Sequence, residues 1–118
     1  MARSEELYLR DMMQCVELIY AYVKGRSFDE FLADEMFRDA VIRRLEIIGE
    51  AAAHLGMPIR ERYPDVEWRD VVAFRNFAIH AYFAIDPLIV WNAATKNASL
   101  LGPKIAAVIA QECPDPPE

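Results

Sequence analysis

The chain lacks an excess of positive charge. It has 13 Lys and Arg residues against 19 Asp and Glu, a formal net charge of −6. A protein that holds nucleic acid by bulk electrostatics shows the opposite balance, so the composition excludes a broad basic binding surface. Any contact with RNA has to be local. Four arginines fall close together: Arg60, Arg62, Arg69 and Arg75. The first three either take part in such a contact or form a solvated face balanced by nearby acids.

Cysteine, histidine and glycine are also scarce. Cys15 and Cys113 have no neighbouring Cys or His at the spacing of metal ligands, and His54 and His80 lie far apart. We therefore expect reduced thiols, no metal site and no cofactor. The four glycines form no phosphate-binding loop motif. Metal-dependent hydrolysis and P-loop chemistry are thus poorly supported.

Long hydrophobic runs are missing too. No apolar stretch reaches the length of a membrane span, and the first six residues lack the apolar core of a secretory signal, so we expect a cytoplasmic protein. The 118 residues, 54% of them apolar, suffice for a core that buries roughly two thirds of the unfolded surface. We expect one domain over residues 1–113 and a loose, proline-rich tail over 114–118.

Apolar residues recur at helical spacing, and no strand-like alternation appears. The sequence therefore predicts an all-α fold, an up-and-down bundle of four to five helices. Gly25, Asp34 and the pair Asp86-Pro87 mark a helix stop and two helix starts. The predicted helices cover residues 4–24, 34–56, 67–80, a stretch from 86 onward and a short last segment near 105–109. Between them we expect a connector at 28–32, a turn-rich link at 58–64 with room for one short helical turn, and a break at 97–103.

The first predicted helix has an apolar face too wide for one neighbour. Two stripes at helical spacing make up this face: Leu9, Met13, Val16, Tyr20 and Val23, and Tyr8, Met12, Cys15, Ile19 and Tyr22. Either the helix lies at the centre of the bundle, or it faces its own core on one side and a second subunit on the other. We favour the second arrangement, a homodimer.

Residues 71–85 form an apolar run interrupted by Arg75, Asn76, His80 and Tyr82. Leaving a guanidinium in apolar surroundings costs roughly several kcal/mol unless it is paired. The run therefore predicts an anionic or hydrogen-bonding partner for Arg75. That partner is either a ligand or a carboxylate of the protein, for instance Glu50.

Arg75 and His80 together suit phosphodiester chemistry without a metal. The guanidinium offers a charged fork for phosphate oxygens, and an imidazole can accept or donate a proton near neutral pH. On an ideal helix Asn76 and His80 lie about 40° apart, whereas Arg75 and His80 diverge by about 140°. Convergence requires that the Arg75 stem curls, that the helix loosens near His80, or that two copies meet across a dimer axis.

Residues 75–82, Arg-Asn-Phe-Ala-Ile-His-Ala-Tyr, contain Arg-x4-His-x-Tyr with Asn after the Arg. This motif resembles that of HEPN-domain proteins, and the chain is most similar to their HepT-type toxin branch. The agreement extends over most of the chain up to Cys113. It includes Ile47-Ile48-Gly49-Glu50-Ala51, Trp68, the run from Tyr82 to Asp86, and Val90-Trp91.

The resemblance implies a metal-independent endoribonuclease toxin of a type VII-like toxin-antitoxin system. Arg75 and His80 would line a cleft at a homodimer interface, where Arg75 binds the scissile phosphate, His80 acts as acid or base, and Asn76 orients the phosphate or His80. The implied antitoxin is a minimal nucleotidyltransferase that adds AMP to Tyr82 and so blocks the cleft. RNA is the implied substrate, with no role for DNA or a membrane.

Two other functions are compatible with the same residues. The chain could be a noncatalytic HEPN module that binds a nucleotide or serves as an adaptor for the nucleotidyltransferase, which predicts nucleotide binding without RNA turnover. Alternatively, it is a helical interaction protein in which Arg75 and His80 only pair with carboxylates such as Glu50. In that case Arg75→Ala should unfold the domain rather than remove an activity.

Overall fold

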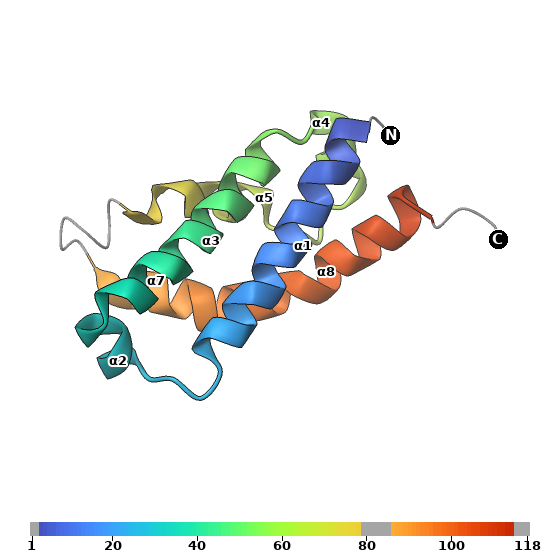
Figure 1. Ribbon diagram of the computed structural model, residues 1–118. Coiled ribbons are helices and arrows are strands. Elements are labelled where there is room, and N and C mark those ends of the chain that lie inside the picture. Colours follow the sequence, from blue (N-terminus) through green and yellow to red (C-terminus); the bar gives the residue numbers. More distant parts are fainter. Residues whose placement is uncertain (1–2, 79–85, 115–118) are drawn as a thin grey trace.

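Three long helices form the body of the protein. The computed structural model describes residues 3–78 and 86–114, and every element within these ranges is helical, which confirms the all-α bundle. Figure 1 shows α1 (Arg3–Val23) lying between α3 (Glu35–Ala53) and α8 (Ala98–Glu112). In the part of the chain described, no helix is long and apolar enough to cross a membrane.

Helix α1 runs antiparallel to α3. The backbone N–H of Gly56, just beyond α3, donates to Glu5 Oε2 at 2.9 Å, and the rings of Tyr8 and His54 stack with centroids 5.0 Å apart. At its other end α1 stops before Gly25, whose φ of +73° is the left-handed conformation that favours glycine. The hydrogen bond and the ring stack join the start of α1 to the end of α3, as expected for an up-and-down chain path.

The wide apolar face of α1 is largely covered within the chain. Its buried residues contact α3 on one side and α8 on the other, as in a helix at the centre of a bundle: Leu9, Met12, Cys15, Val16 and Ile19. Tyr20 is 59% exposed, beside a groove of about 480 Å³ that has small residues of α8 on its other wall. The predicted second subunit is therefore not needed to explain the width of this face.

The predicted connector at 28–32 is wrong, because these residues form helix α2 (Phe28–Ala33). Ser27 caps the helix: its hydroxyl oxygen accepts a hydrogen bond from the backbone N–H of Glu30 at 3.2 Å. Phe31 is fully buried on the inner side. A cap and one buried aromatic residue are thus among the contacts that hold a segment too short to show helical periodicity.

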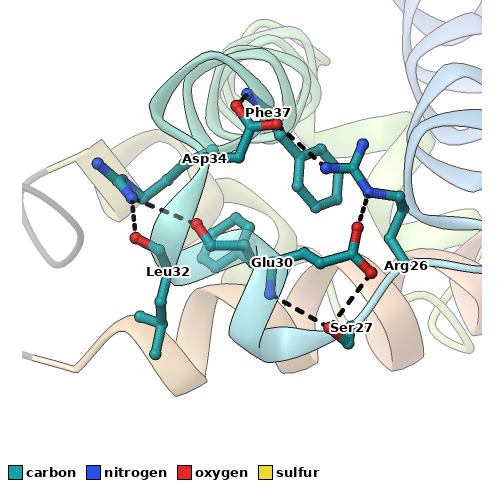
Figure 2. A network of polar contacts seen from close by, with 8 residues as sticks. Arg26, Ser27, Glu30, Leu32, Asp34 and Phe37 are labelled. Carbon is teal, nitrogen blue, oxygen red and sulfur yellow. Dashed lines mark hydrogen bonds and ion pairs between the residues drawn. The ribbon is translucent and has the colours of Figure 1, made fainter.

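Asp34 begins α3 as predicted. Its carboxylate accepts from the backbone N–H of Phe37 at 3.0 Å, and this hydrogen bond lowers the pKa of Asp34. Figure 2 shows Arg26 beside the Asp34 carboxylate, with ion pairs to Glu30 at 2.6 Å and to Asp34 at 3.1 Å. Its guanidinium also lies 3.9 Å from the centre of the Phe37 ring. Arg26 therefore fastens the loop after α1 to the starts of α2 and α3.

An aromatic cluster closes this end of the bundle. The ring of Phe31 lies 5.2 Å from that of Trp91 and 5.9 Å from that of Phe37, and the ring of Phe28 lies 6.4 Å from those of both Phe31 and Trp91. Trp91 belongs to α7 (Pro87–Asn92). As predicted, Asp86 caps α7, accepting from the backbone N–H of Leu88 at 3.0 Å. The cap and the aromatic cluster thus fix the start of α7 against the bundle.

The predicted break at 97–103 is wrong. A π-helical turn, η2 (Ala93–Asn97), continues into α8, which runs for 15 residues and contains Pro103. Buried Leu101, Ile105 and Val108 hold this helix in the core, and this packing outweighs the penalty for proline. The Thr95 hydroxyl donates to the carbonyl of Trp91 at 2.8 Å, which satisfies one of the acceptors in the widened turn. From residue 115 the predicted tail lies outside the described residues.

Candidate functional site

The first half of the candidate motif lies on a tight turn instead of a regular α-helix. Helix α5 (Trp68–Ala73) is followed by a 3₁₀ turn, η1 (Phe74–Asn76), after which residues 77–78 are helical again. The predicted helix over 67–80 is therefore helical from Trp68 to residue 78, but it changes from α-helical to 3₁₀ geometry at 74–76. A 3₁₀ turn is narrower than an α-helix and rotates its side chains further per residue, so ideal α-helical angles do not apply here.

Two phenylalanines hold this turn against the core. Phe74 and Phe77 are only 5% and 8% exposed, and their rings stack with centroids 5.0 Å apart. The two residues between them, Arg75 and Asn76, are exposed. In this turn both aromatic rings therefore face the core, and the two polar side chains between them lie together in solvent.

The expectation that Arg75 lies in apolar surroundings is wrong, because its side chain is exposed. Water solvates the guanidinium, so the fold does not require an anionic partner for it. Among the described residues no ion pair involves Arg75, and the side chain of Glu50 is itself exposed. The predicted alternative of a structural Arg75–Glu50 pair is therefore not observed. A charged fork is left available for an anion such as phosphate.

The nearby arginines divide by role. Arg60 of α4 (Met57–Arg62) donates to the carbonyls of Ala52, Ala53 and Leu55 at 2.8–3.2 Å, so it satisfies the C-terminal end of α3. Arg62 pairs with Glu112 of α8, which raises the pKa of Arg62. Both are occupied by structural contacts. Arg69 is exposed on α5, as Arg75 is on the turn that follows.

The remaining predicted site residues are His80 and Tyr82, and both lie outside the described residues. The structure therefore brings together Arg75 and Asn76, while the predicted convergence of Arg75 with His80 stays a prediction. Within residues 3–78 and 86–114, no group of three or more His, Cys, Asp or Glu side chains could hold a metal ion. Cys15 and Cys113 are free and buried, and burial raises the pKa of both thiols.

For one residue near the site the sequence alone predicts no role. Gly49, which belongs to the Ile-Ile-Gly-Glu-Ala segment of α3, is buried and lies directly against the backbone of Arg75. A glycine inside a helix is a signal for close backbone approach. From sequence alone, however, the approaching segment could not be identified.

Comparison with known proteins shows several relatives. The chain is 33% identical over 106 residues to "Putative RNase MJ1380" of Methanocaldococcus jannaschii, covering 90% of this chain and 97% of that protein. It is 36% identical over 97 residues to "Probable ribonuclease HepT" of Thermococcus cleftensis, covering 82% and 88%.

A longer relative, "Gamma-glutamylcyclotransferase and putative RNase MJ0434" of M. jannaschii, is 33% identical over 111 residues. These cover 94% of this chain but 50% of that protein, so the chain spans about half of its length. No solved structure matches the chain. Residues 12–109, most of the chain, match the family described as "Ribonuclease HepT-like". The protein therefore belongs to the HepT-like ribonuclease family.

Proposed function

We propose that this protein is a metal-independent endoribonuclease toxin of a type VII-like toxin-antitoxin pair, acting in the cytoplasm. The observation that carries the proposal is the exposed Arg75–Asn76 pair on a turn fixed by buried Phe74 and Phe77, in a member of a ribonuclease family. Relatives named as ribonucleases support RNA as the substrate.

In the proposed reaction Arg75 holds the scissile phosphate and stabilises the negative charge that develops on it. His80 removes the proton from the ribose 2′-hydroxyl, whose oxygen attacks phosphorus. The O2′–P bond forms and the P–O5′ bond breaks, leaving a 2′,3′-cyclic phosphate and a 5′-oxygen that takes up a proton to become a hydroxyl. DNA lacks the 2′-hydroxyl and is not a substrate in this scheme.

The proposal includes a homodimer. A twofold axis near the motif would bring two copies of Arg75, Asn76 and His80 to one cleft, so that one imidazole can act as base and the other as acid. Such a cleft is compatible with the net charge of −6, because a few arginines at fixed positions hold the RNA and no broad basic surface is needed.

Cleavage of RNA by the purified protein in the presence of EDTA tests the proposed reaction. We expect cleavage by the wild type and a loss of about 10²–10⁴-fold in His80→Ala, the range that general acid-base catalysis contributes. The matched control is His54→Ala, which removes the other histidine of the chain and should retain activity. A folded, dimeric wild type that leaves RNA intact, or binds nucleotides without turnover, would contradict the proposal and favour the noncatalytic module.

Tyr82 is the proposed site of control by the antitoxin. AMP on this phenol would place a bulky, negatively charged group beside the cleft and so repel RNA. After coexpression with the cognate nucleotidyltransferase, we expect the intact mass to rise in steps of one adenylate. The increase should disappear in Tyr82→Phe and persist in Tyr20→Phe, a control at an exposed tyrosine. Modification that persists in Tyr82→Phe would rule out this site.

A further inference from the structure

Gly49 lies where α3 meets the turn that carries Arg75. A Cβ atom placed on Gly49 would lie 2.4 Å from the backbone nitrogen of Arg75, 2.9 Å from the carbonyl oxygen of Val72 and 3.1 Å from the Cα atom of Arg75. Ordinary van der Waals contact begins near 3.4 Å. No side chain larger than hydrogen fits at this position without movement of the backbone.

The kind of atom met by the added carbon decides how much has to move. At Gly49 all three neighbours are backbone atoms, and two of them belong to Arg75. Rotation of a side chain cannot relieve the overlap, so the turn has to move away from α3 by about 1 Å to restore contact distance. At Gly102 of α8 the nearest atom is a methyl carbon of Val16 at 3.1 Å, the end of a side chain. The two buried helical glycines are thus a test position and its control.

A movement of the turn away from α3 would disturb the packing of the aromatic residues on either side of Arg75 and Asn76. Phe74 and Phe77 fix its inner side in the core, and Gly49 sets its distance from α3. We propose that Gly49 is a positioning residue for Arg75. Because Gly49 has no side chain, the Arg75 backbone packs directly on α3, and this contact fixes the position at which the guanidinium meets the phosphate. This inference rests on the proposed function of Arg75 and adds the element that places it.

Gly49→Ala, compared with Gly102→Ala, tests the inference. A misplacement of about 1 Å can cost about 10²-fold in rate, so we expect kcat/KM for RNA cleavage to fall by about that factor in Gly49→Ala. Gly102→Ala should stay within about threefold of the wild type, because the overlap there is smaller and involves no atom of the turn that carries Arg75. Circular dichroism and thermal unfolding establish that both variants are folded at the assay temperature. Equal activity of the two variants would overturn the proposal.

A double-mutant cycle with Arg75→Ala distinguishes positioning from a general structural effect. If Gly49 acts through Arg75, Gly49→Ala should cause no further loss of kcat/KM when Arg75 is already alanine. A loss as large as in the wild-type background would overturn the proposal.

If Gly49→Ala does not fold, Phe74→Leu shifts the same turn from its core side with a modest change of volume. Unchanged kcat/KM in a folded Phe74→Leu protein would then show that the position of the turn does not matter. The amide chemical shift of Arg75 supplies a readout without turnover. A shift in Gly49→Ala but not in Gly102→Ala supports the seating of the turn even if the wild type cleaves no RNA, an outcome that would refute the proposed function alone.

Discussion

Arg75→Ala is expected to lower kcat/KM for RNA cleavage by about 10²–10³-fold, the loss typical of removing one group that stabilises transition-state charge. The side chain is exposed and has no ion pair among the described residues, so its removal should leave the unfolding midpoint nearly unchanged. Single-turnover cleavage rates and thermal unfolding of the same preparations measure the two effects separately.

Two further variants sharpen this result. Arg75→Lys keeps the charge but loses the planar fork, so its activity should lie between those of the wild type and Arg75→Ala. Arg10→Ala removes an arginine from a surface ion pair with Glu6 on α1 and makes the same change in net charge. It should cleave RNA like the wild type. Loss of folding in Arg75→Ala would instead support the interaction protein in which Arg75 is a structural residue.

Phe31→Ala is expected to reduce the free energy of unfolding by about 3–5 kcal/mol, the range for a buried phenylalanine. Phe31 is 0% exposed and lies at the centre of the aromatic cluster formed with Phe28, Phe37 and Trp91. Its loss leaves a cavity among α2, α3 and α7, and the surrounding aromatic rings cannot fill this cavity completely. Urea unfolding followed by tryptophan fluorescence reports this change, because Trp91 is one of the two tryptophans of the chain.

Leu32→Ala is the control for Phe31→Ala. Leu32 is the next residue of the same short helix but is 44% exposed, so its truncation should cost well under 1 kcal/mol. A similar loss in both variants would mean that α2 as a whole, and not the aromatic cluster, responds to mutation. A loss below about 1 kcal/mol in Phe31→Ala would show that the cluster contributes little to stability.

Much of the fold could be predicted from sequence because helix ends depend on local chemistry. Asp34 and Asp86 cap helices through backbone N–H groups two or three residues away, and Gly25 supplies a left-handed residue. The same reasoning missed α2, whose six residues are too few for a periodic pattern. It also placed a break at 97–103, where burial of the surrounding side chains keeps the helix intact through Pro103.

Some features of the candidate site could likewise be predicted from the sequence, and others could not. Its residue types, a guanidinium, an amide, an imidazole and a phenol at fixed spacing, are readable in the sequence and led to the family to which the chain belongs. Their surroundings were predicted wrongly for Arg75, which was expected in an apolar environment and is exposed. An apolar run does not reveal which of its residues face the core when the helix changes its period from α to 3₁₀.

The sequence by itself determined the all-helical class, several helix boundaries and the chemical groups of the site, since each depends on neighbours within a few residues. Only the tertiary structure decided that Arg75 faces water, that Pro103 lies inside a helix and that Gly49 touches the Arg75 backbone from 26 positions earlier in the chain. Such contacts depend on packing between segments distant in sequence, where the free energy of burial and the exclusion of overlapping atoms override local preference.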